Sequence, residues 1–69
     1  MTWKILNESG ATVESHDAPK AAYRAMMILS AHEIKNGRMA NYRVEPMIVI
    51  PYTIEELNLP LWAKKALGV

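Results

Sequence analysis

The two histidines are the side chains in this 69-residue chain with the clearest capacity for proton transfer or metal binding. His16 stands in the run Ser15-His16-Asp17, which has the three residue types of a hydrolytic triad. Adjacent residues point apart, so these side chains do not meet, and we interpret the run as a strand end that leads into a helix cap. His32 lies within a helical pattern. We expect a partly buried helix histidine there, because a metal site needs three or four convergent ligands.

The adjacent carboxylates Glu55 and Glu56 have the residue type needed for acid–base catalysis. They follow Thr53 at the spacing of a capping box, which favours a structural role at a helix start. The three glycines of the chain are too few to build a phosphate-cradling loop, and the absence of cysteine excludes disulfides and thiolate metal sites. The sequence therefore predicts a chain that is not an enzyme and that binds neither a cofactor nor a metal.

A long helix over residues 18–36 is the element around which the others must pack. We expect Asp17 to cap its first turn, where Pro19 is tolerated because first-turn amides have no helical partner. Gly37 can take the left-handed conformation that ends a helix. At about 100° per residue, one stripe of mostly small side chains faces inward. This stripe consists of Ala18, Ala22, Ala25, Met26 and Leu29.

Short strands precede and follow this helix. Residues 2–6 and 11–15 predict a hairpin around the turn at residues 7–10, with Val13 facing inward. Residues 42–50 form the strongest strand pattern, which Pro46 restricts to a sheet edge or a bulge. Residues 47–50 are apolar on both sides, so we expect this stretch to be covered twice.

The C-terminal segment predicts a short helical tail. Pro51 ends the third strand, a helical turn runs through Leu57, and a last helix over residues 61–67 ends at Gly68. The predicted fold is one small two-layer α+β domain over residues 1–69, with the order ββαβα and the helix lying across an antiparallel sheet.

A second apolar stripe on the long helix has two interpretations. Tyr23, Met27 and Ile34 lie on it, away from the inward stripe. Either the tail of the same chain covers this stripe, or another protein docks on it. Under the second interpretation, Arg24 and Trp62 complete the predicted protein-binding set with these three residues.

Composition and charge narrow the classes of partner. The chain is 51% hydrophobic and 22% charged with a net charge of +1, which is typical of a folded domain and too balanced for a polyelectrolyte. A chain this short buries only about 60% of its unfolded surface, so we expect self-association, with edge strands pairing in a homodimer. No apolar run approaches the ~20 residues of a membrane span, and no signal peptide is legible. We expect a cytoplasmic protein.

Two functions follow as hypotheses. The first is a non-catalytic interaction protein, such as an accessory subunit, a regulator or a phage-type inhibitor of a host system, because many short stand-alone chains of bacteria and phages act in this way. The alternative is nucleic-acid binding through a basic helix ridge and the basic residues that follow it. The predicted basic set is Lys20, Arg24, Lys35, Arg38 and Arg43.

Overall fold

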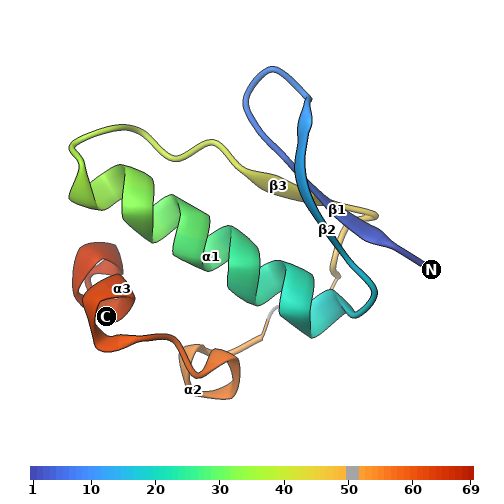
Figure 1. The fold of residues 1–69 in the computed structure, drawn as a ribbon. Coiled ribbons are helices and arrows are strands. Elements are labelled where there is room, and N and C mark those ends of the chain that lie inside the picture. Colours follow the sequence, from blue (N-terminus) through green and yellow to red (C-terminus); the bar gives the residue numbers. More distant parts are fainter. Residues whose placement is uncertain (50–51) are drawn as a thin grey trace.

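The long central helix, α1, spans Pro19–Lys35 in the computed structural model, which describes residues 1–49 and 52–69 (Figure 1). The prediction that Asp17 caps it is wrong, because Ala18 is the extended N-cap residue and no side chain bonds to the first turn. Pro19 begins the helix without losing a hydrogen bond, since the first amides have no helical partner. At the other end, Gly37 has a φ of +73°, as predicted for a left-handed terminating residue.

The strands β1 (Trp3–Leu6), β2 (Thr12–His16) and β3 (Arg43–Glu45) form an antiparallel sheet in the order β2-β1-β3 within the described residues. The predicted hairpin is confirmed. Its turn is held by the Asn7 side chain, whose Oδ1 accepts hydrogen bonds from the amides of Ser9 and Ala11 at 3.0 Å each. Gly10 supplies the positive φ that closes the turn.

Val13 lies in an irregularity of the hairpin, and the prediction that it faces inward is wrong. Ile5 pairs with Glu14, but the next residue, Leu6, pairs with Thr12, so the register passes over Val13. An extra residue on one strand has no partner on the other strand, and its side chain no longer follows the alternation between the two faces of the sheet. Val13 is accordingly 43% exposed, while Ile5 and Leu6 are buried.

The third strand is much shorter than the predicted strand over residues 42–50. β3 ends at Glu45, because the following Pro46 has no amide to donate to the ladder. Met47 is 81% exposed and Val49 is 85% exposed, so the expectation that this stretch is covered on both sides is wrong for these two residues. The end of the predicted strand, at residues 50 and 51, lies outside the described residues.

The α1 helix lies between the sheet and the C-terminal tail (Figure 1). On the predicted inward stripe, Ala22 is fully buried and Ala25, Met26 and Leu29 are partly buried, whereas Ala18 is exposed as the N-cap residue. Small side chains on this stripe let the helix approach the sheet closely. The order of the strands and helices along the chain confirms the predicted α+β fold, ββαβα, in which the last α stands for the helical tail.

The tail consists of α2 (Ile54–Leu57) and α3 (Leu61–Leu67). Thr53 caps α2 as predicted, since its Oγ1 accepts a hydrogen bond from the Glu56 amide at 3.2 Å. The Glu56 carboxylate accepts a hydrogen bond from the Thr53 hydroxyl rather than from the Thr53 amide. None of the helices in residues 1–49 and 52–69 is both long and apolar enough to cross a membrane.

A buried cluster joins the tail to the side of α1 that faces away from the sheet. Its buried members are Ala31, Leu57, Leu59 and Ala63. The two alanines come from α1 and α3, so the helix backbones can lie close together, while Leu57 and Leu59 fill the space beside them. This cluster fixes which side chains of α1 and α3 remain at the surface.

Candidate functional site

Two of the predicted protein-binding residues, Tyr23 and Met27, are partly buried beneath the tail. Both pack against the buried cluster that joins α1 to α2 and α3. The Tyr23 ring meets the Tyr52 ring edge to face, with their centroids 5.9 Å apart and an angle of 62° between the rings. For these two residues the structure matches the interpretation in which the tail of the same chain covers the second apolar stripe.

Arg24, a member of both predicted sets, is tied to the tail by a hydrogen bond. Its Nε donates to the backbone carbonyl of Leu57 at 3.0 Å. Leu57 is the last residue of α2, where carbonyl groups have no helical partner. Arg24 therefore satisfies a helix end and helps to hold α2 against α1.

Trp62 remains partly at the surface, with 39% of the residue exposed, and its neighbour Leu61 is 67% exposed. The Lys35 Nζ lies 5.5 Å from the centroid of the Trp62 ring, which is a cation–π distance. We call Leu61, Trp62 and Lys35 the α3 surface. Ile34 is also exposed, but it points about 100° away from Lys35 around the axis of α1 and lies to one side of this surface.

Four residues of the predicted basic set are engaged by groups of the same chain. Arg38 pairs with Glu33, Arg43 pairs with Glu45, Arg24 holds the Leu57 carbonyl, and Lys35 lies over Trp62. Glu33 and Lys35 are two residues apart in the helix, so they lie about 200° apart around its axis. Arg38 and Lys35 are thus drawn to different sides of α1. Lys20 is exposed in the first turn.

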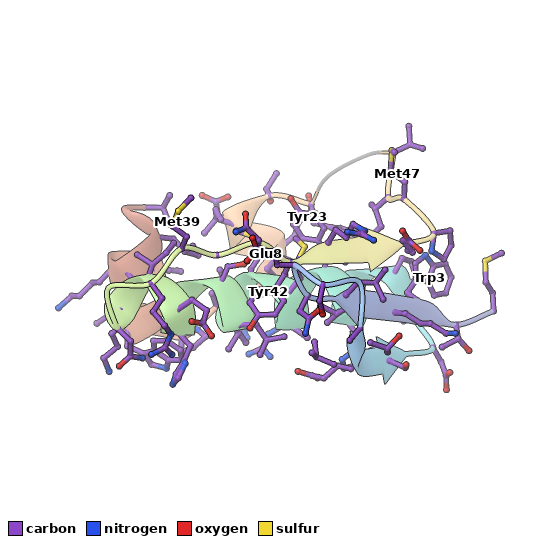
Figure 2. All side chains as sticks on the ribbon, turned by 90° about the horizontal axis from the view of Figure 1, so that it is seen from above. Trp3, Glu8, Tyr23, Met39, Tyr42 and Met47 are labelled. Atoms are coloured by element: carbon purple, nitrogen blue, oxygen red, sulfur yellow. The ribbon has the colours of Figure 1, made fainter. Side chains whose placement is uncertain are left out.

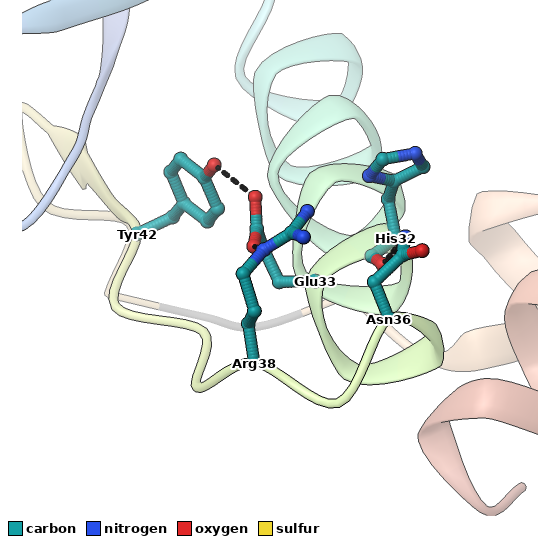
Figure 3. A network of polar contacts seen from close by, with 5 residues as sticks. All are labelled: His32, Glu33, Asn36, Arg38 and Tyr42. Carbon is teal, nitrogen blue, oxygen red and sulfur yellow. Dashed lines mark hydrogen bonds and ion pairs between the residues drawn. The ribbon is translucent and has the colours of Figure 1, made fainter.

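A polar cluster that no sequence pattern predicted joins the end of α1 to the segment before β3 (Figure 3). The Glu33 carboxylate accepts hydrogen bonds from the Arg38 Nε and from the Tyr42 hydroxyl, the latter at 3.3 Å. The Arg38 amide also donates to the Glu33 carbonyl at 2.9 Å. The left-handed turn at Gly37 reverses the chain and brings Arg38 back over Glu33. Two opposite charges on either side of a predicted terminating glycine are the sequence signal that could have identified this pair.

The electrostatics of this cluster favour a structural role. The hydrogen bond and the charge of Arg38, with the hydrogen bond of Tyr42, lower the pKa of the Glu33 carboxyl against the opposing effect of burial. Burial, followed by the neighbouring Glu33 carboxylate, raises the pKa of the Tyr42 phenol. A carboxylate with a lowered pKa is a weaker base, and a phenol with a raised pKa is a weaker acid. Both shifts move these groups away from the pKa range that suits proton transfer at neutral pH.

A hollow of about 330 Å³ adjoins this cluster, between the hairpin turn and the segment that leads to β3. Its lining includes Glu8, Glu33, Asn41 and Tyr42. The Glu33 carboxylate is already engaged by Arg38 and Tyr42. What this hollow offers a ligand is therefore mainly the amide of Asn41 and the carboxylate of Glu8.

The remaining candidates for chemistry lie apart from one another. His16 contacts Glu14 at 3.1 Å in β2, His32 is exposed on α1, and Glu56 is engaged at the start of α2. In the part of the chain that the structure describes, no group of three histidine, aspartate or glutamate side chains is arranged to hold a metal ion.

No protein-family model matches this chain, and neither a curated protein nor a solved structure is similar enough to match it.

Proposed function

We propose that this chain is a non-catalytic protein-interaction module that docks onto another protein through the α3 surface. The observation that carries the proposal is the position of Trp62. The residue next to it, Ala63, is fully buried in the cluster with α1, yet 39% of Trp62 and 67% of Leu61 stay exposed. A short helix that packs against the buried cluster through Ala63, Ala66 and Leu67 thus keeps two large apolar side chains at its surface.

The chemistry of this surface supports docking onto a protein. Tryptophan is enriched among the residues that dominate binding energy at protein interfaces, because it buries a large rigid area and keeps an N–H for one hydrogen bond. Lys35 places a positive charge over the indole ring. Such a surface favours a partner that offers an apolar pocket with an acidic rim. An accessory subunit, a regulator or an inhibitor would act through docking of this kind.

The test uses a photo-crosslinking amino acid at position 61 in cells that produce the chain. We expect a discrete crosslinked product with one protein, because position 61 is exposed and lies beside Trp62. The matched control carries the same probe at position 13, where an exposed apolar residue stands in the hairpin. A product that forms at both positions alike, or at neither, would refute docking through the α3 surface.

A second variant separates loss of docking from loss of folding. L61K introduces a charge at an exposed position and should leave the melting temperature within a few degrees of the parent chain. It should abolish capture of the crosslinked partner, whereas V13K should retain capture. Equal capture by both variants would contradict the proposal.

A further inference from the structure

The two outer strands of the described sheet differ in how well they could pair with another strand. β2 carries the irregularity at Val13, and such bulges twist an edge away from further pairing. β3 pairs with β1 in an unbroken register, in which Lys4, Ile5 and Leu6 face Glu45, Val44 and Arg43. The outer edge of β3 is therefore the regular one.

The sequence of β3 is complementary to itself when two copies run antiparallel. Val44 faces the buried Ile5, so its side chain lies on the helix side of the sheet, whereas Arg43 and Glu45 lie on the opposite side. In an antiparallel pair centred on Val44, Arg43 of each copy stands opposite Glu45 of the other, and directly opposite side chains share a face. Within one chain the Arg43 Nε donates to Glu45 Oε1 at 3.2 Å, and both side chains stay 57% and 58% exposed, so each can also reach a paired strand. A β2 pair centred on Glu14 would instead oppose two carboxylates.

Exposed apolar side chains lie beside this edge. Met47 and Val49 lie in the segment after β3 and are largely exposed. A hollow of about 250 Å³ adjoins the strand, and its lining includes Tyr23, Met26 and Ile48. Figure 2 shows Met47 standing out from the molecule on the side where Tyr23 and β3 lie. A strand that pairs with β3 would bring apolar side chains of its own chain to this hollow.

We infer that a second copy of this chain pairs with β3 in an antiparallel register centred on Val44, which joins two sheets across a two-fold axis. The same patch then meets itself in both copies, as in isologous dimers. The two Arg43–Glu45 contacts fix the register, and the Met47 and Val49 side chains add buried apolar area at both ends of the paired strands.

The test is a pair of charge reversals measured by sedimentation across a dilution series. R43E gives a strand with carboxylates on both sides of Val44, and E45R gives a strand with guanidinium groups on both sides. Each variant alone should dimerise at least about tenfold more weakly than the parent chain, because two attractive contacts become two repulsive ones. A mixture of the two variants should restore dimerisation, since every acidic side chain then faces a basic one.

The mixture also shows that neither variant is merely unfolded, because unfolded chains would not complement each other. The matched control is E14R, a charge reversal on the other edge of the sheet. This variant should dimerise as strongly as the parent chain. The inference is overturned if the parent chain stays monomeric over the whole series, if R43E and E45R dimerise like the parent, or if their mixture fails to associate. It is equally overturned if E14R alone abolishes the dimer.

Discussion

Leu57→Ala should be among the most destabilising single substitutions in this chain. Leu57 is 1% exposed and packs in a cluster with Ala31, Leu59 and Ala63. Removing a buried leucine side chain typically costs about 2–5 kcal/mol, and the cost rises when the neighbours cannot close the cavity. Two of the three other buried members are alanines, which have no side-chain rotamers with which to fill the space, whereas partly buried neighbours such as Met27 can shift toward it. We therefore expect a loss near the middle of that range.

This loss is large compared with the total stability expected for the domain. The free energy of unfolding of a small domain is roughly 0.05–0.15 kcal/mol per residue, which gives about 3–10 kcal/mol for a chain of this length. In a domain of this size each kcal/mol corresponds to about 4–8 °C in melting temperature, so the variant should melt at least about 10 °C lower than the parent chain. The hydrogen bond from Arg24 to the Leu57 carbonyl is kept, because the substitution leaves the backbone in place.

The assay is urea and thermal unfolding, followed by circular dichroism and by tryptophan fluorescence. Trp62 reports on the tail and Trp3 reports on the sheet. Leu61→Ala is the matched control, because it removes the same atoms from a side chain that is 67% exposed. We expect it to change the free energy of unfolding by no more than about 0.5 kcal/mol. Equal losses in the two variants, or a loss below about 1 kcal/mol for Leu57→Ala, would refute the assignment of this cluster as the core of the tail.

Three further predictions concern the cap, the polar cluster and the basic residues. Thr53→Ala should lower the free energy of unfolding by about 0.5–2 kcal/mol in urea titrations, whereas Thr53→Asp should retain most of it, because both Thr and Asp accept a hydrogen bond from the third amide. The pKa of Glu33 is lowered in the folded chain, so its contribution to stability is present above the ordinary pKa of a glutamate and is lost as the pH falls through the lowered value. Melting temperatures measured across acidic pH should consequently fall less steeply for Glu33→Gln than for the parent chain. If nucleic acid is the ligand, K20E combined with K35E should remove binding to a single-stranded oligonucleotide, and the parent affinity should fall steeply with salt. An affinity that does not change with salt would reject this alternative.

The elements that the sequence predicts well are those with strong local signals. Gly37 and Gly68 take the left-handed conformations expected at helix ends, and Thr53 caps α2 at the expected spacing. The burial of Ala22 follows from the helical period of the inward stripe. These features depend on residues within a few positions of one another, which is why periodicity and capping rules suffice for them.

The features that the sequence does not predict depend on pairing between distant segments. Whether Val13 faces inward is decided by the register of β1 against β2, and an alternating pattern within one strand does not reveal a register shift. The pattern over residues 42–50 predicts a longer strand, but the ladder between β3 and β1 ends at Glu45, before Pro46. Burial of Tyr23 and Met27 likewise depends on where the tail folds, which left two interpretations open.

The two proposed surfaces are compatible with each other because α1 separates them. The α3 surface lies on the tail side of α1, and β3 belongs to the sheet on the other side (Figure 1). A dimer formed through β3 would leave Leu61 and Trp62 uncovered in both copies, and would therefore present two identical docking surfaces related by the two-fold axis. Against a partner that is itself dimeric, the second contact would form within the complex, and such coupling raises the apparent affinity by about 10²–10⁴ when the geometry allows both contacts. The gain in affinity would come from linking the two sites and would need no further contact on α3.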